Sequence, residues 1–154
     1  MPKLKIVTDS SCDLPPSYFS SYDIGVVPIN IRFGNEDYLE GVTIDADTFY
    51  QKIRANGTLP KTSQPSVGQF VEHYLRWAKE GVDTILSIHV ASTLSGTLNS
   101  ATLAAQEVAD KIRVIPFDTL SGSAAMGFMC MEAAQLTQIG QSVEDIVARL
   151  SEAR

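Results

Sequence analysis

The alternation of short apolar strand patterns with longer helical patterns is the feature that most constrains how this chain can fold. Three runs of β-branched and apolar residues read as strands, at residues 3–8, 83–90 and 113–118. A polar loop and a helical pattern follow each of them. This order is typical of a mostly parallel sheet flanked by helices on both faces, so the predicted fold class is α/β.

The remaining elements fill the space between these strands. Residues 24–33 read as one strand, the turn at 34–35 follows it, and residues 38–39 are expected to pair back as a hairpin. Residues 60–65 are predicted to be a loop because of their composition. Ser66 and Gln69 form a capping-box pattern, while Ser92 and Thr93 are expected to cap the next helix. Helices are predicted at about 15–22, 45–55, 66–78, 92–108, 121–139 and 142–150.

Composition narrows the class of protein. The 154 residues suffice for one domain, and 44% hydrophobic with 19% charged residues is typical of a globular protein. A net charge of -6 with no basic cluster argues against nucleic-acid binding. No apolar stretch is long enough to span a membrane, and no signal peptide precedes the first strand. Two distant cysteines, Cys12 and Cys130, favour a reduced, cytoplasmic protein.

Hydroxyl-bearing residues gather where the predicted strands and loops lead into helices. They occupy residues 8–11, 62–66, 91–97 and 118–123. Ligands of open α/β sheets bind beyond the carboxyl ends of the strands, and helix N-termini favour anions. Gly96 would let a ligand approach the backbone closely. The pattern predicts a small anionic head group, although ordinary helix capping also explains such residues.

Other side chains suggest alternatives. His89 lies near a strand end, so a phosphoryl carrier of the sugar-phosphotransferase type is one alternative; a partly buried histidine with one hydrogen bond is the simpler interpretation. His73 is expected at the surface. A serine hydrolase using Ser95 is a third hypothesis. Asp9 and Asp118 could form a metal pair, but such residues more often cap loops, and neither a metal nor a cofactor is predicted.

Taken in order, several motifs resemble the DegV family of bacterial fatty-acid-binding proteins. The sequences Thr-Ser-Gln-Pro and Leu-Ser-Gly-Thr, about thirty residues apart, form the most specific pair. The resemblance covers essentially the whole chain. The motifs are KIVTDSS at 5–11, DLP at 13–15, VP at 27–28, FG at 33–34, KTSQPS at 61–66, SIHV at 87–90, LSGT at 94–97 and SA at 100–101.

The resemblance implies a two-lobed protein that binds one long-chain fatty acid, such as palmitate (hexadecanoate), between its lobes. It implies lipid binding without enzymatic activity: the fatty acid is presented to a separate fatty acid kinase, which forms an acyl-phosphate for phospholipid synthesis. Carried over by motif, Thr62 and Ser95 would hydrogen-bond the carboxylate, with Ser63 and Gly96 supporting them. The apolar helix at 121–139 would line part of the tail channel or pack in the core.

Family members are nearly twice as long as this chain. Residues 1–154 therefore correspond to the N-terminal lobe, and the C-terminal lobe is absent from this chain. In the family the second lobe covers the acyl tail and is expected to supply a basic group. We expect this chain alone to bind fatty acid weakly and to expose an apolar face. The preferred acyl chain and the particular kinase are left open, as is whether the protein naturally ends at Arg154.

Overall fold

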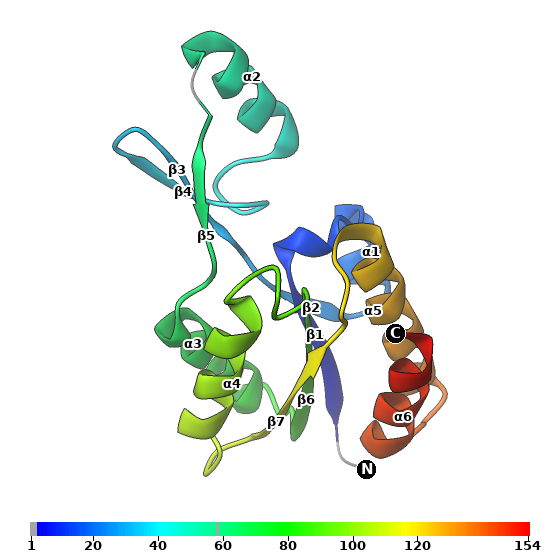
Figure 1. Ribbon diagram of the computed structural model, residues 1–154. Helices are drawn as coiled ribbons and strands as arrows, with labels where there is room; N and C mark the ends of the chain where they lie inside the picture. Colours follow the sequence, from blue (N-terminus) through cyan, green and yellow to red (C-terminus); the bar gives the residue numbers. More distant parts are fainter. Residues whose placement is uncertain (1–2, 58) are drawn as a thin grey trace.

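A four-stranded parallel sheet forms the centre of the molecule. The computed structural model describes residues 3–57 and 59–154 (Figure 1). The strand order is β2-β1-β6-β7, and every neighbouring pair is parallel. The strands are β1 (Leu4–Asp9), β2 (Ile24–Val27), β6 (Thr84–His89) and β7 (Arg113–Asp118). The α/β class with a mostly parallel sheet is thus confirmed.

Helices cover both faces of this sheet (Figure 1). On one face α3 (Val67–Lys79) and α4 (Thr97–Glu107) bury an apolar cluster that includes Val7, Phe70 and Ala101. On the other face lie α1 (Pro16–Ser21), α5 (Ser123–Gln138) and α6 (Val143–Ala153), and their cluster includes Ile6 and Ile146. The buried faces of the helices explain the apolar spacing seen in the sequence.

A second, antiparallel sheet projects beyond the carboxyl edge of the parallel sheet, at the top of Figure 1. Its strand order is β4-β3-β5, and the helix α2 packs beside it. Its own small core contains Ile31, Phe33 and Ile44, with Phe49 of α2 packed against them. The elements are β3 (Asn30–Phe33), β4 (Glu36–Leu39), α2 (Ala46–Asn56) and β5 (Lys61–Ser63).

Two strand predictions were wrong in detail. The single strand predicted at 24–33 is two strands in different sheets, β2 and β3, separated at Pro28. Proline has no backbone N–H for a strand ladder, so a break there is physically reasonable. The predicted loop at 60–65 contains β5, which pairs with β3. The hairpin was predicted correctly, because Phe33 pairs with Glu36 across a turn with Gly34 at φ 59°.

The helix starts were predicted with mixed success. The capping box of Ser66 and Gln69 is confirmed, since each side chain bonds the other residue's backbone N–H. The cap predicted at Ser92 and Thr93 is wrong, because α4 begins only at Thr97 and the Ser92 hydroxyl donates to Asp118 instead. None of the helices within 3–57 and 59–154 combines the length and the apolar character needed to cross a bilayer.

Candidate functional site

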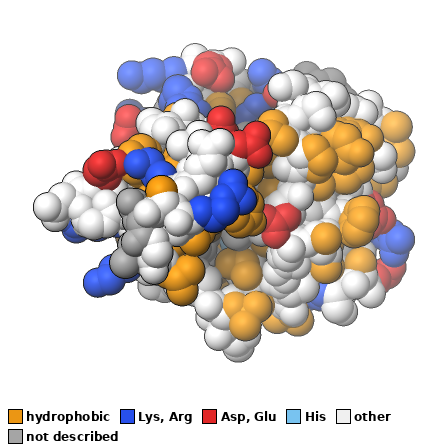
Figure 2. All heavy atoms as spheres, turned by 90° about the horizontal axis from the view of Figure 1, so that it is seen from above, with side chains coloured by type: hydrophobic (Ala, Val, Ile, Leu, Met, Phe, Trp, Pro, Cys, Tyr) orange, Lys and Arg blue, Asp and Glu red, His pale blue; other side chains and the backbone are white. Residues whose placement is uncertain are grey.

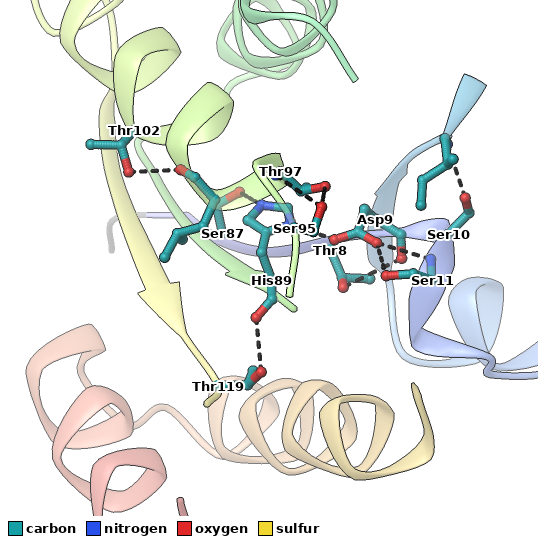
Figure 3. Close-up of polar contacts among 12 residues, drawn as sticks. Thr8, Asp9, Ser10, Ser11, Ser87, His89, Ser95, Thr97, Thr102 and Thr119 are labelled. Carbon is teal, nitrogen blue, oxygen red and sulfur yellow. Dashed lines mark hydrogen bonds and ion pairs between the residues drawn. The ribbon is translucent and has the colours of Figure 1, made fainter. Parts of the chain in front are cut away.

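The loop between β6 and α4 carries the first predicted binding residue, Ser95. Its hydroxyl oxygen accepts the backbone N–H of Thr97 at 3.2 Å and lies 2.9 Å from the Thr97 hydroxyl (Figure 3). The backbone N–H of Ser95 donates to Ala91 at 3.2 Å. Ser95 is half-buried and immediately precedes Gly96, the N-cap of α4. Its side chain therefore has a defined orientation and stays partly accessible.

Gly96 marks the place where the two predicted binding segments meet. A Cβ atom at Gly96 would lie only 2.7 Å from Nε2 of Gln64, which is closer than side chains approach one another. The missing side chain of Gly96 thus makes room for Gln64, the residue that follows Thr62 and Ser63. The contact brings the β5 segment against the start of α4.

Strand register separates the roles of Thr62 and Ser63. Thr62 pairs with Ile31, and Ser63 pairs with Asn30. Paired residues of an antiparallel sheet project from the same face, and successive residues project from opposite faces. Thr62 therefore shares the face of Ile31, whereas Ser63 shares the face of Asn30. Both hydroxyl residues are exposed.

A side-chain network holds β5 and the start of α3 against β3. The Asn30 amide donates to Gln69 Oε1 at 3.0 Å and accepts from Gln69 Nε2 at 2.9 Å. Asn30 also donates to the backbone carbonyl of Gln64 at 3.2 Å. These bonds restrain the segment that carries Thr62, so Thr62 is placed by folding before any ligand arrives.

An apolar groove lies on the same side of the small sheet as Ile31. Its volume is about 540 Å³, within the range of small-molecule sites. The groove runs between the α1 region and the small sheet with α2. Its apolar lining comes from both parts of the molecule and includes Leu14, Pro16, Phe19, Ile31, Ile44 and Phe49.

Acidic side chains stand at this groove. Asp13, Glu40 and Asp45 line it, and the Ser10 hydroxyl donates to Glu40 Oε2 at 2.6 Å. Burial raises the pKa of Glu40; the bond from Ser10 opposes this effect, and the charges of Asp13 and Asp9 add to it. A bound anion would be repelled from this part of the groove.

The apolar helix α5 mainly serves the core. Its residues Met129 and Cys130 are buried in the cluster under the sheet, and Met126 packs with Leu14. Phe128 of α5 is 68% exposed, and Leu120 in the loop before α5 is 62% exposed. Seen from above, hydrophobic side chains gather on the side of the molecule that carries α1 and α5 (Figure 2). The expected exposed apolar surface is present.

His89 is a buried, hydrogen-bonded histidine, as the simpler interpretation expected, but it is more deeply buried and has one more hydrogen bond than that interpretation gave it. The residue is fully buried and makes two hydrogen bonds, at 2.7 Å to Asp9 and 2.6 Å to Ser87, which in turn lies 2.7 Å from Tyr74 (Figure 3). The rings of Phe70 and His89 pack edge to face, with their centroids 5.2 Å apart. Because both ring nitrogens are hydrogen-bonded and the ring is closed off from solvent, a phosphoryl donor has no access to His89, which argues against the phosphoryl-carrier alternative. An aspartate, a histidine and a serine do lie in series here, but this serine is Ser87 and is itself buried.

The carboxylates considered as a metal pair have other partners. Asp9 binds His89 and the backbone N–H of Ser11, and Asp118 accepts from Ser92 at 2.7 Å and Leu120 at 2.9 Å. Burial is the largest influence on the pKa of Asp9 and by itself raises that pKa. The hydrogen bond and charge of His89, together with the hydrogen bonds from Ser11, outweigh burial, so the pKa of Asp9 is lowered overall. No cluster of three or more metal-ligand side chains occurs among the described residues.

His73 also differs from its prediction. It is half-buried, not at the surface, and its ring lies 5.5 Å from that of Trp77. Sequence reasoning missed two further residues, Gln64 and Thr97, which belong to the same short motifs as Thr62 and Ser95. Gln64 stands out because it contacts Gly96 in the other segment, and Thr97 because its hydroxyl meets that of Ser95. The one signal in the sequence was that both residues belong to the quoted motifs.

The fold defines a class of protein: an α/β lobe whose parallel sheet is covered by helices on both faces, with a small antiparallel sheet beside an apolar groove. More specifically, the chain belongs to the DegV family. The family model described as "Uncharacterised protein, DegV family" matches residues 3–154.

Individual relatives agree with this assignment. A DegV domain-containing protein of Clostridium perfringens is 40% identical over the whole chain, and a fatty acid-binding protein of Thermotoga maritima is 37% identical over 97% of it. The crystal structure of DegV, a fatty acid binding protein from Bacillus subtilis, superposes with a TM-score of 0.93 at 36% identity over 99% of this chain. The chain spans about half the length of these relatives, namely 54%, 52% and 54%.

Proposed function

We propose that this chain binds a long-chain fatty acid such as palmitate, with the carboxylate at Thr62 and Ser95 and the acyl chain in the apolar groove. The observation that carries the proposal is the contact between Gln64 and Gly96, which unites the two segments. Thr62 shares a sheet face with Ile31, and Ile31 lines the groove. An acyl chain in the groove would thus lie on the sheet face that carries Thr62.

The head-group end supplies neutral hydrogen-bond donors. Each hydroxyl that donates to a carboxylate contributes about 1.5–3 kcal/mol when it is sheltered from water. Thr62 and Ser95 would make these bonds directly. Ser63, on the opposite sheet face, would support the strand, and Gly96 would keep room for Gln64. The N-terminus of α4 adds a favourable partial charge.

The groove would take the acyl chain because of its lining and charge. Apolar side chains such as Leu14, Phe19 and Phe49 offer contacts for methylene groups. Asp13 and Glu40 would repel a carboxylate from the same space. The lipid should therefore lie with its charged end toward Thr62 and Ser95 and its tail toward α1 and α2.

We further propose that residues 1–154 act as the first lobe of a DegV-type binding protein, without enzymatic activity of their own. The support is the family membership together with the coverage of about half of each relative. The partner suggested by the family resemblance is a fatty acid kinase that converts the presented carboxylate to an acyl-phosphate for phospholipid synthesis. The free, buried Cys12 and Cys130 fit a reducing, cytoplasmic location.

The test is palmitate binding by variants of the head-group site. The double variant Thr62→Ala with Ser95→Ala should lose palmitate in isothermal titration and in native mass spectrometry, while its circular dichroism spectrum is unchanged. Ser151→Ala, which removes a hydroxyl that donates to the Val147 carbonyl within α6, is the matched control and should bind normally. Equal binding by the double variant, or no binding by the wild-type chain at saturating palmitate, would contradict the proposal.

A further inference from the structure

The hydroxyl of Thr97 lies directly behind Ser95. Its Oγ1 atom is 2.9 Å from Ser95 Oγ, and the Thr97 side chain is fully buried at the first turn of α4. The backbone N–H of Thr97 donates to the same Ser95 oxygen at 3.2 Å. Figure 3 shows both contacts converging on Ser95. The hydroxyl and the backbone N–H of Thr97 therefore both contact the hydroxyl of Ser95, which is predicted to bind the ligand.

Burial decides which hydroxyl donates. Within the described part of the chain, Ser95 Oγ is the side-chain partner found for the Thr97 hydroxyl. If Ser95 donated to Thr97, the Thr97 proton would be buried without an acceptor, and such unsatisfied donors are rare and costly. If Thr97 donates to Ser95, its proton is satisfied. The second arrangement is therefore favoured.

This arrangement determines what Ser95 can offer a ligand. A serine hydroxyl accepts about two hydrogen bonds and donates one. The two acceptor positions of Ser95 are taken by the N–H and O–H of Thr97. Its own proton is then the remaining group, and it can be donated to a ligand.

We propose that Thr97 is a positioning residue that makes Ser95 a dedicated hydrogen-bond donor. The inference rests on the proposed function and deepens it: the site selects a head group that only accepts hydrogen bonds, namely a carboxylate. A fatty alcohol, which needs an acceptor for its own proton, gains less from a Ser95 oriented in this way. Selectivity for the ionised acid thus depends on a residue that does not touch the lipid.

Two substitutions separate orientation from packing. Thr97→Val keeps the shape of the buried side chain and removes the hydroxyl, while Thr97→Ser keeps the hydroxyl and removes the methyl group. By titration calorimetry, Thr97→Val should bind palmitate roughly three- to tenfold more weakly, the size of one net hydrogen bond. Its affinity for 1-hexadecanol should change less than about twofold, within the error of such energies. Thr97→Ser should restore the palmitate preference.

Several results of this titration would overturn the proposal. These are an unchanged palmitate affinity in Thr97→Val, an equal loss for palmitate and hexadecanol, or a Thr97→Ser variant as weak as Thr97→Val. Ser95→Ala serves as the reference. If Ser95→Ala binds palmitate like the wild type, the proposed carboxylate site is wrong. Whether Thr97 donates its hydroxyl proton to Ser95 is tested separately, by a measurement without ligand.

That measurement is proton NMR of the unliganded chain. The buried Thr97 hydroxyl proton should exchange slowly enough to be seen, should show a nuclear Overhauser contact to the β-protons of Ser95, and should vanish in Thr97→Val. A Thr97 hydroxyl proton that exchanges as fast as an exposed one would refute the donor order, whether or not the chain binds lipid.

Discussion

Gly96→Ala is the most informative single perturbation, because it acts where the two binding segments meet. The new Cβ would stand 2.7 Å from Nε2, 3.1 Å from Cδ and 3.3 Å from Oε1 of Gln64. Gly96 has φ -79°, a conformation open to alanine, so the backbone itself is not strained. The side chain of Gln64 is exposed and can move aside. Gly96→Ala should thus weaken palmitate binding by disturbing the geometry of the site, and should change the free energy of unfolding little.

The expected magnitudes follow from this contact. Replacing glycine by alanine at a helix N-cap costs only about 0.5 kcal/mol, so the free energy of unfolding should fall by less than about 1 kcal/mol. When the Gln64 side chain moves aside, the contact between the β5 segment and the start of α4 is lost, so Thr62 and Ser95 are no longer held together, and a misplaced hydrogen bond to a carboxylate loses about 1.5–3 kcal/mol. Palmitate binding should weaken by at least tenfold, the equivalent of about 1.4 kcal/mol.

The assay combines urea unfolding with palmitate titration. Gly68→Ala is the matched control, because the nearest atom to its new Cβ, Ser66 Oγ, is 3.9 Å away. That variant should keep wild-type binding and be slightly more stable, since alanine suits a helix better. The double variant Gly96→Ala with Gln64→Ala should recover most of the affinity. Normal binding by Gly96→Ala alone, or no recovery in the double variant, would refute the reasoning.

Three further predictions concern the buried network, the groove and the length of the chain. His89→Leu should destabilise the fold by about 3 kcal/mol or more in urea unfolding, because it strands the buried Asp9 carboxylate, whereas His73→Leu should change stability far less; similar losses would contradict this reading. Because the folded-state pKa of Glu40 is raised, its contribution to stability is present at acidic pH and lost as pH rises through that pKa. Glu40→Gln should therefore gain stability relative to the wild type between acidic and neutral pH, and a constant difference would disprove it. Palmitate should bind this chain more weakly than the longer Bacillus subtilis DegV protein, and equal affinities would show that one lobe suffices.

The parallel sheet was predictable because its signal is local. The segment Thr84–His89, for example, is buried along almost its whole length, so most of its residues are apolar or β-branched and the strand pattern is clear. The small sheet was harder to predict. Lys61–Ser63 is short, polar and exposed, and only its pairing with β3 makes it a strand.

The candidate site was predictable in part for a related reason. The motifs around Thr62 and Ser95 pointed to residues that the structure brings onto meeting segments, although their role in binding stays a prediction. The burial of His89 was not predictable, because it depends on Asp9, far away in the sequence, and on the helix that carries Phe70. Contacts between distant segments leave no local pattern.

The central claim is that a fatty carboxylate sits at Thr62 and Ser95 with its tail in the groove. A crystal structure of the chain with palmitate tests it most directly. The account predicts both hydroxyl oxygens within hydrogen-bond distance of the carboxylate, and methylene carbons against Phe19 and Ile31. A carboxylate found instead beside Glu40, or a lipid bound only on the exposed face around Phe128, would contradict it.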